Sequence, residues 1–243
     1  MRRVLLILLF VTTTLIANSE LEFDSFDNEF EEEYIEVYDP LIGYNRAMTS
    51  FNDSFYKHIA MPVARGYKEV VPNPLRRGIS NFFNNLFYPI RLVNNLLQFK
   101  IENAIDETNR FLINSTVGIL GFRDVARHSF QIEPKNEDFG QTLGHWGLGS
   151  GVHIVLPILG PSNLRDVFGR VGDIYSDPIS SNSYRDIRIP EDSWQSLGLN
   201  VIETTNDLSH NPDLYENVTK DAIDLYIFLR DSYEQKRDKE IKE

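Results

Sequence analysis

The sequence of 243 residues contains no cysteine. Disulfide bonds are therefore excluded, so the fold must be stabilised by packing, and there is no thiol to which a lipid could be attached. Basic residues are outnumbered, with 24 lysines and arginines against 36 acidic residues, and they form no basic stripe. Nucleic acid is for this reason not an expected partner.

Histidine is also scarce, and its spacing matches no metal site. The five histidines form neither an H-x-x-x-H nor an H-E-x-x-H pattern, so each is expected to be an ordinary polar side chain. The segment G-L-G-S-G at 147–151 lacks the Lys-Ser/Thr pair of a phosphate-binding loop, and Ser150 is one place away from a G-x-S-x-G nucleophile. The sequence predicts no catalytic residue, no metal and no cofactor, so we do not expect an enzyme.

Strand-forming patterns are almost missing. Only Gly151 to Leu156 carries a β-branched apolar run, which is too short for a sheet of its own. Elsewhere apolar residues recur every three or four positions, which is the spacing of an amphipathic helix. Proline starts helices well and cannot continue them, so X-Pro pairs mark where segments begin. We therefore predict an all-α fold punctuated at Asp39-Pro40, Met61-Pro62, Asn73-Pro74, Tyr88-Pro89, Asp177-Pro178, Ile189-Pro190 and Asn211-Pro212.

Aromatic residues are abundant, with 16 phenylalanines and 11 tyrosines, and aromatics with a polar tip suit surfaces that meet both lipid and water. The first helix is expected to start with Asp39 as its N-cap and to turn its apolar face mostly toward a core. Between residues 79 and 120 the apolar faces are unusually dense, with asparagines and arginines on the other side, which suits either a deep core or a lipid interface. The predicted apolar face of the first helix consists of Leu41, Tyr44, Met48, Phe51, Phe55 and Ile59.

Further helices are predicted toward the C-terminus. A short helix should follow Asp124, and Ser162 should cap another that holds Arg165 and Asp166. Two more are expected from Pro190 to about Leu208 and from Pro212 to about Arg237.

The N-terminus has the pattern of an export signal. Two arginines, thirteen uncharged residues and a small-residue stretch predict a secretory signal at 1–19, with an uncleaved anchor as the alternative. Residues 20–38 are strongly acidic and predict a disordered spacer. We expect a helical domain at 39–233 and a charged, fraying tail at 234–243. The mature protein should therefore act outside the cytoplasm.

Residues 138–166 depart most from an ordinary soluble domain. Glycines 140, 144, 147, 149, 151 and 160 accompany an uncharged run from Val152 to Leu159. This density predicts a glycine-rich loop or short hairpin. Arg165 and Asp166 follow it, and we expect them to form a buried pair at its exit.

Several long motifs, in order along residues 39–216, resemble the MlaA (VacJ) family of outer-membrane lipoproteins. The resemblance implies a ring-like helical protein in the inner leaflet of the outer membrane, with an amphipathic channel. It implies that mislocalised phospholipids leave the outer leaflet through this channel and pass to a periplasmic carrier, and that a trimeric porin is a further partner. The motifs are D-P-L-I-G-Y-N-R-A-M (39–48), V-P-N-P-L-R-R-G-I-S-N-F (71–82), F-L-I-N-S-T-V-G-I-L-G-F-R-D-V-A (111–126), E-D-F-G-Q-T-L-G-H-W-G-L-G-S-G (137–151), L-P-I-L-G-P-S-N-L-R-D (156–166) and N-P-D-L-Y (211–215).

The resemblance also implies roles for particular residues. Phe51 and Asn52 match the family's channel-controlling segment, whereas Thr49 and Ser50 stand where the family has an aromatic-asparagine pair. We expect the run Val152–Leu159 to be a lipid-facing or channel-side wall. A further hypothesis is that the loop's glycines bend to gate lipid passage, the alternative being that they only fit tight turns. The channel and loop candidates are Gly144, Gly147, Gly149, Gly151, Phe51, Asn52, Arg165 and Asp166.

The family's acylated cysteine has no counterpart in this chain. Either the helical faces or a porin must then hold the protein at the outer membrane, or it is a soluble periplasmic version. A different class of function, a structural adaptor of porins or envelope complexes that moves no lipid, also remains open. An enzyme acting on phospholipid is the third possibility, and the lack of a nucleophile with its base argues against it.

Overall fold

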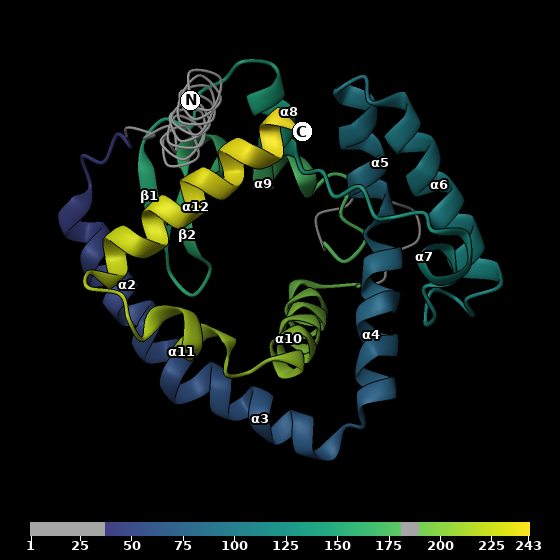
Figure 1. The fold of residues 1–243 in the computed structure, drawn as a ribbon, viewed down its shortest axis with the longest axis horizontal. Coiled ribbons are helices and arrows are strands. Elements are labelled where there is room, and N and C mark those ends of the chain that lie inside the picture. The colour runs from purple at the N-terminus through teal and green to yellow at the C-terminus, as the bar shows by residue number, and fades with distance from the viewer. Residues whose placement is uncertain (1–36, 181–189) are drawn as a thin grey trace, which may run out of the picture. The chain divides into compact units, whose positions relative to one another are not determined.

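The computed structural model describes residues 37–180 and 190–243. Most of these residues are helical. The predicted signal and nearly all of the predicted acidic spacer lie outside the described residues. Residues Val37–Glu243 form one compact unit, in which the helices lie around a ring and the hairpin and α10 lie on its inner side (Figure 1). The predicted all-α fold with one short hairpin is confirmed. The elements are α2 (Ile42–Phe55), the π-helix η1 (Tyr56–Ala60), α3 (Met61–Val70), α4 (Asn73–Leu86), α5 (Tyr88–Leu97), α6 (Ile101–Thr116), α7 (Val125–Phe130), α8 (Phe139–His145), β1 (His153–Leu156), β2 (Gly160–Asn163), α9 (Leu164–Asp173), α10 (Ser193–His210), α11 (Leu214–Thr219) and α12 (Leu225–Lys242).

Proline marks helix starts only in part as predicted. Pro74 and Pro89 occupy the first turns of α4 and α5, where their missing N–H groups cost nothing. Pro62 instead follows the π-helix η1 within continuous helical backbone, in which Ala60 and Met61 are both α-helical, and Pro178 lies in a turn. Asp124 caps α7 as expected, by accepting a hydrogen bond from the Arg127 amide.

Two predicted caps are wrong. Asp39 does not cap α2, which begins at Ile42; its carboxylate instead accepts hydrogen bonds from Asn45 and from Tyr226 of α12. Asn163, not Ser162, caps α9 by accepting from the Asp166 amide. Asp39 makes tertiary contacts instead of capping α2. For α9, the neighbouring Asn163 supplies the cap.

The predicted C-terminal helix and tail also need correction. The chain breaks after α11 at Thr219 and starts again in α12, because Asp224 accepts hydrogen bonds from the amides of Tyr226 and Ile227. Residues 234–242 do not form a frayed tail. They continue α12, and both Glu234 and Arg237 are buried.

The burial of α2 is the reverse of the prediction. Its apolar face is largely exposed, with Leu41 at 40% and Phe51 at 51% of full exposure, whereas Asn45, Thr49 and Asn52 are buried. The same inversion occurs in α5, where Asn94 and Asn95 are buried and Val93 and Leu96 are exposed, and in α6, where Glu107, Arg110 and Asn114 are buried and Ile105 and Leu112 are exposed.

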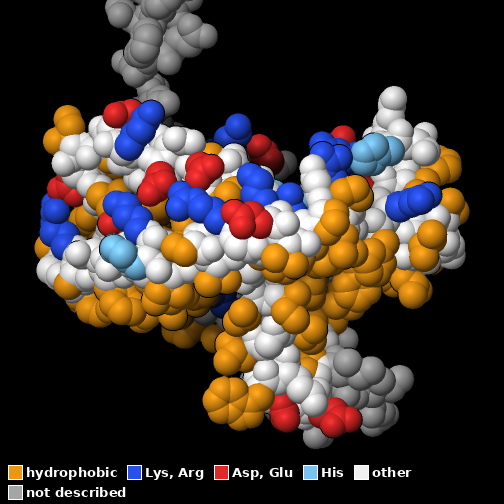
Figure 2. Space-filling view, turned by 90° about the horizontal axis from the view of Figure 1, so that it is seen from below, with side chains coloured by type: hydrophobic (Ala, Val, Ile, Leu, Met, Phe, Trp, Pro, Cys, Tyr) orange, Lys and Arg blue, Asp and Glu red, His pale blue; other side chains and the backbone are white. Residues whose placement is uncertain are grey.

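This inversion favours the interfacial alternative for residues 79–120, because apolar helix faces turned outward need an apolar surrounding. Charged side chains gather on one side of the ring, and a broad apolar band covers the opposite side (Figure 2). Among the described residues, no helix has both the length and the apolar character needed to cross a bilayer.

Candidate functional site

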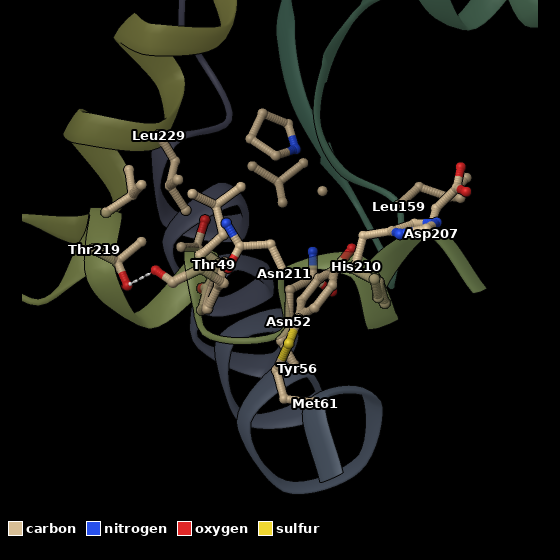
Figure 3. Close-up of a pocket in the computed structure, with 17 residues that line it drawn as sticks. Thr49, Asn52, Tyr56, Met61, Leu159, Asp207, His210, Asn211, Thr219 and Leu229 are labelled. Carbon is tan, nitrogen blue, oxygen red and sulfur yellow. Dashed lines mark hydrogen bonds between the residues drawn. The ribbon is translucent and has the colours of Figure 1, made fainter. Parts of the chain in front are cut away.

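A cavity of about 580 Å³ lies between α2, the hairpin and the segment from α10 to α12 (Figure 3). Its residues come from α2 and the following π-helix, the hairpin, the end of α10, α11 and α12. Aliphatic and aromatic side chains supply most of the wall. Hydroxyl, amide and imidazole groups and the Asp207 carboxylate supply the smaller polar part, so the cavity is amphipathic. It is lined by Thr49, Asn52, Tyr56, Met61, Val155, Leu159, Gly160, Pro161, Asp207, Leu208, His210, Asn211, Leu214, Tyr215, Val218, Thr219 and Leu229.

Two buried asparagines of α2 bind the hairpin beside this cavity. Asn45 accepts from the amide of Val155 at 2.9 Å and donates to the carbonyl of His153 at 3.1 Å. Asn52 accepts from the amide of Ile158 at 2.7 Å and donates to the carbonyl of Leu156 at 2.8 Å. Each amide side chain thus pairs with the backbone as a neighbouring strand would.

The spacing explains why both asparagines reach β1. Seven residues of α-helix rise about 10.5 Å, and the three residues from Val155 to Ile158 span about 10 Å of extended chain. The other edge of β1 pairs with β2 in the register His153↔Asn163 to Leu156↔Gly160. The two asparagines of α2 therefore supply hydrogen bonds that a third strand would otherwise make. They satisfy backbone N–H and C=O groups at the buried edge of the hairpin.

A tyrosine contact holds the tip of the hairpin. Ile158 at the tip has a φ of 66°, which is unfavourable for a β-branched residue. Its amide is held by Asn52 and its carbonyl accepts from the Tyr56 hydroxyl at 3.1 Å. Both backbone groups of Ile158 are therefore fixed by α2 and the π-helix that continues it, and such π-turns often occur at functional sites.

Tyr56 is held in turn by α11. Its ring stacks on Tyr215, with ring centroids 5.2 Å apart, and the Tyr215 hydroxyl donates to Asp53 at 2.9 Å. Burial, together with the neighbouring Asp53 carboxylate, raises the pKa of Tyr215 above its ordinary value. Tyr215 therefore stays protonated and keeps this hydrogen bond at physiological pH.

The predicted site residues do not all meet at this cavity. Asn52 lines it, as does Thr49, to which the family role was not carried. Phe51 faces outward on the exposed apolar side of α2. Within the run Val152–Leu159, only Val155 and Leu159 line the cavity. No site role was predicted for Tyr56 or Tyr215, although Tyr215 ends the N-P-D-L-Y motif and the asparagines seven residues apart in α2 could be seen in the sequence.

Arg165 and Asp166 lie together and buried, as predicted, with Nε and Oδ1 3.1 Å apart. They belong to a larger network. Asp166 also accepts from Arg237 Nε at 2.9 Å and from the Tyr233 hydroxyl at 2.6 Å. Arg237 reaches Asp138 as well, with two hydrogen bonds of 2.9 Å.

This network lies apart from the amphipathic cavity. Asp138, Asp166, Tyr233 and Arg237 line a second, charged cavity of about 750 Å³ between the α4–α5 side and the α8, α9 and α12 side. Burial on its own would raise the pKa of Asp166, but the hydrogen bond and positive charge of Arg237 outweigh it and lower the pKa below the ordinary value.

The four candidate glycines, at 144, 147, 149 and 151, differ in their local conformation and contacts. Gly147, with a φ of 88°, ends α8: its amide donates to Gly144 and the Leu148 amide donates to Leu143, which is a Schellman helix end. A side chain at Gly144 would meet Ile241 of α12 at 2.6 Å, and Gly151 has a φ of 72°. Gly149 has neither constraint. The positive φ values support the tight-turn alternative for Gly147 and Gly151, whereas Gly144 lies inside α8. The gating role stays a prediction.

The glycines can be separated by substitution. Gly147→Ala should lower the free energy of unfolding by about 1 kcal/mol, because alanine is strained at positive φ. Gly149→Ala should change it by less than about 0.5 kcal/mol or stabilise slightly. Chemical denaturation of both variants checks this, and equal destabilisation by the two substitutions would contradict it.

The relatives of this chain agree with its architecture. The family model described as MlaA lipoprotein matches residues 37–240. The chain belongs to the MlaA lipoprotein family. The “Intermembrane phospholipid transport system lipoprotein MlaA” of Escherichia coli (strain K12) is 34% identical over 203 residues, covering 82% of this chain and 77% of that protein. An uncharacterized protein of Rickettsia typhi, RT0044, is 30% identical over 245 residues, covering 97% of this chain and 93% of that protein.

A solved structure extends the family likeness to the fold. It is described as “Structural basis for maintenance of bacterial outer membrane lipid asymmetry” and matches with a TM-score of 0.71 and 32% identity, over 84% of this chain and 98% of that chain. The ring of helices described above is therefore a fold of the MlaA family. In the described parts of this member, no group of three or more His, Asp or Glu side chains could hold a metal ion.

Proposed function

We propose that this protein takes part in retrograde phospholipid transport, removing mislocalised phospholipids from the outer leaflet of the outer membrane and so maintaining lipid asymmetry. The observation that carries the proposal is the amphipathic cavity inside a ring whose outer faces are apolar. The transport function named for the Escherichia coli relative supports it.

The cavity meets the physical demands of such a path. A phospholipid headgroup is costly to place in hydrocarbon, because its charges lose their hydration. Thr49, Asn52, Asn211 and the hydroxyl groups beside them offer polar contacts, and the aliphatic wall offers contacts for an acyl chain. Helices suit the surrounding ring because they satisfy their own backbone groups in an apolar medium.

Location and partners follow from the same proposal. The protein is exported and sits in the inner leaflet of the outer membrane, with its apolar band in lipid and its charged side toward the periplasm. A trimeric porin is its neighbour, and a periplasmic carrier of the same pathway receives the lipid. The protein does no covalent chemistry. A soluble periplasmic location and an adaptor that moves no lipid are the alternatives that experiment must separate.

Lipid bound to the purified protein tests the proposal. Phospholipid identified by mass spectrometry should accompany the wild type and fall by about tenfold, or 1.4 kcal/mol of binding, in Val218→Trp, whose ring fills the cavity from α11. Val201→Trp is the matched control, since Val201 is equally exposed on α10 but does not line the cavity. Wild-type protein that carries no phospholipid from a membrane fraction would favour the adaptor, and recovery wholly in the soluble periplasm would contradict the embedded ring.

A further inference from the structure

The turn between α6 and α7 displays bulky apolar residues in a strained backbone. Ile119 and Leu120 have φ values of 57° and 56°, a region that β-branched and bulky residues rarely adopt. Their side chains are 61% and 68% exposed, so burial in this chain does not compensate for the strain. Strain of this kind persists where the surrounding structure fixes it and is concentrated at functional sites.

The turn is held rigidly from both sides. The Leu120 amide donates to Ser115 and the Gly121 amide donates to Asn114, both in α6, and the Arg123 amide donates to the Gly118 carbonyl. A turn so completely hydrogen-bonded cannot fold its apolar tip back onto the ring. Ile119 and Leu120 are therefore presented outward as a fixed pair.

A cavity of about 440 Å³ with a positive lining adjoins this turn. Arg77 of α4 bonds only to the side-chain oxygen of Asn73, and Arg123 has no side-chain hydrogen bond or ion pair within the described ranges. Asp124, the one carboxylate in the lining, is engaged by Arg110 at 2.9 Å. The cavity is lined by Asn73, Pro74, Arg77, Gly78, Asn81, Phe122, Arg123, Asp124, Val125, His128 and Ser129.

The end of the ring that carries α6 and α7 has both charged and apolar surface (Figure 2). Toward the α6 and α7 end of the ring, cationic and histidine side chains border the apolar band (Figure 2). Arginines at such a border suit the phosphate level of a bilayer, and apolar side chains beside them suit the acyl region. Guanidinium groups are well matched to phosphate oxygens.

We propose that this cavity binds the phosphate of an anionic membrane phospholipid through Arg77 and Arg123. Ile119 and Leu120 then insert among the acyl chains of the surrounding lipids. This chain has no cysteine that could be acylated. The site holds the ring to the bilayer instead. It rests on the proposed function only in requiring that the protein meets a membrane. It shares no lining residue with the 580 Å³ cavity, so the bound lipid is an anchor and not the transported molecule.

Vesicle cosedimentation of the full-length protein tests the charge arm. The combined variant Arg77→Gln and Arg123→Gln should lose affinity for vesicles of phosphatidylcholine with phosphatidylglycerol by about fivefold for each arginine, and the loss should shrink at high salt. On vesicles of phosphatidylcholine alone the variant should match the wild type. Arg65→Gln is the control, because it removes the same charge from an arginine already paired with Asp213 and Glu216.

Substitution of the turn tests the apolar arm. Asparagine tolerates positive φ, so Ile119→Asn and Leu120→Asn should keep or raise the melting temperature while lowering affinity for both kinds of vesicle. That combination distinguishes a membrane contact from a structural role. Unchanged vesicle binding by the double arginine variant or by both turn variants overturns this site and leaves the proposed function standing. If the wild type binds neither vesicle, the membrane location fails together with the site.

Discussion

Replacing Arg237 by methionine is expected to lower the free energy of unfolding by about 3–5 kcal/mol. The guanidinium is buried and joins α12 to α8 and α9 through Asp138 and Asp166. Removing it leaves the Asp166 carboxylate buried with only Arg165 as a cationic partner, and an uncompensated buried charge is far costlier than an intact pair is stabilising. Chemical denaturation in detergent measures the loss.

The neighbouring lysine provides the control for Arg237. Lys236→Met should change stability by less than about 0.5 kcal/mol, because that side chain is 73% exposed and reaches only Glu240, at 3.6 Å. If the two substitutions cost the same, the network does not fix α12. If residues 234–243 formed a frayed tail, neither substitution would change the free energy of unfolding.

The Arg237 effect should depend on pH. In the wild type the pKa of Asp166 lies below its unfolded value, so its ionised form stabilises the fold above about pH 4 and this stabilisation is lost as the pH falls through the folded pKa. The difference in unfolding free energy between wild type and Arg237→Met should therefore be largest near neutrality and shrink below about pH 4. A constant difference would mean that Arg237 acts by packing alone.

Replacing Asn52 by alanine is expected to free the tip of the hairpin. The substitution removes two short hydrogen bonds, to the amide of Ile158 and the carbonyl of Leu156, each contributing about 1–1.5 kcal/mol. Hydrogen exchange at the Ile158 amide should therefore quicken by roughly 30-fold to 150-fold. Because Ile158 is held in a strained conformation, its tip should move once released and change the opening of the neighbouring cavity.

An asparagine elsewhere separates this effect from a general one. Asn200 of α10 is exposed and donates only to Ser196 in its own helix, so Asn200→Ala should leave exchange in the hairpin unchanged. Continued protection of the Ile158 amide in Asn52→Ala would mean that Tyr56 alone fixes the tip. In that case Tyr56→Phe, which removes the bond to the Ile158 carbonyl, becomes the deciding variant.

The positions of most helices could be predicted from the sequence, because proline and periodicity act locally. Pro74 and Pro89 mark the starts of their helices wherever the chain lies in space. Periodicity also identified the apolar face of α2, but it could not tell what that face meets. A stripe that packs into a core and one that meets lipid have the same spacing, so Phe51 was assigned to the wrong side.

The site could be predicted only in part. Asn52 was found through motif resemblance, yet its partner Ile158 lies 106 residues away, and no local pattern links them. The charged residues at 234–243 were expected to be solvated, because charged side chains usually lie at the surface. Arg237 is instead matched by Asp166, 71 residues earlier, and only the folded chain brings the two together.

The contact between α2 and α12 bears on the order in which the molecule is made. Asp39, just before α2, accepts a hydrogen bond from Tyr226, and Glu234 and Arg237 of the same late helix tie down the hairpin and α8. A chain made from its N-terminus onward cannot form these contacts until α12 has been synthesised. Until then Asp39, His153 and Asp138 lack the partners that α12 supplies. The chain is therefore an open arc until α12 forms, and the ring closes when α12 packs against the hairpin and α8.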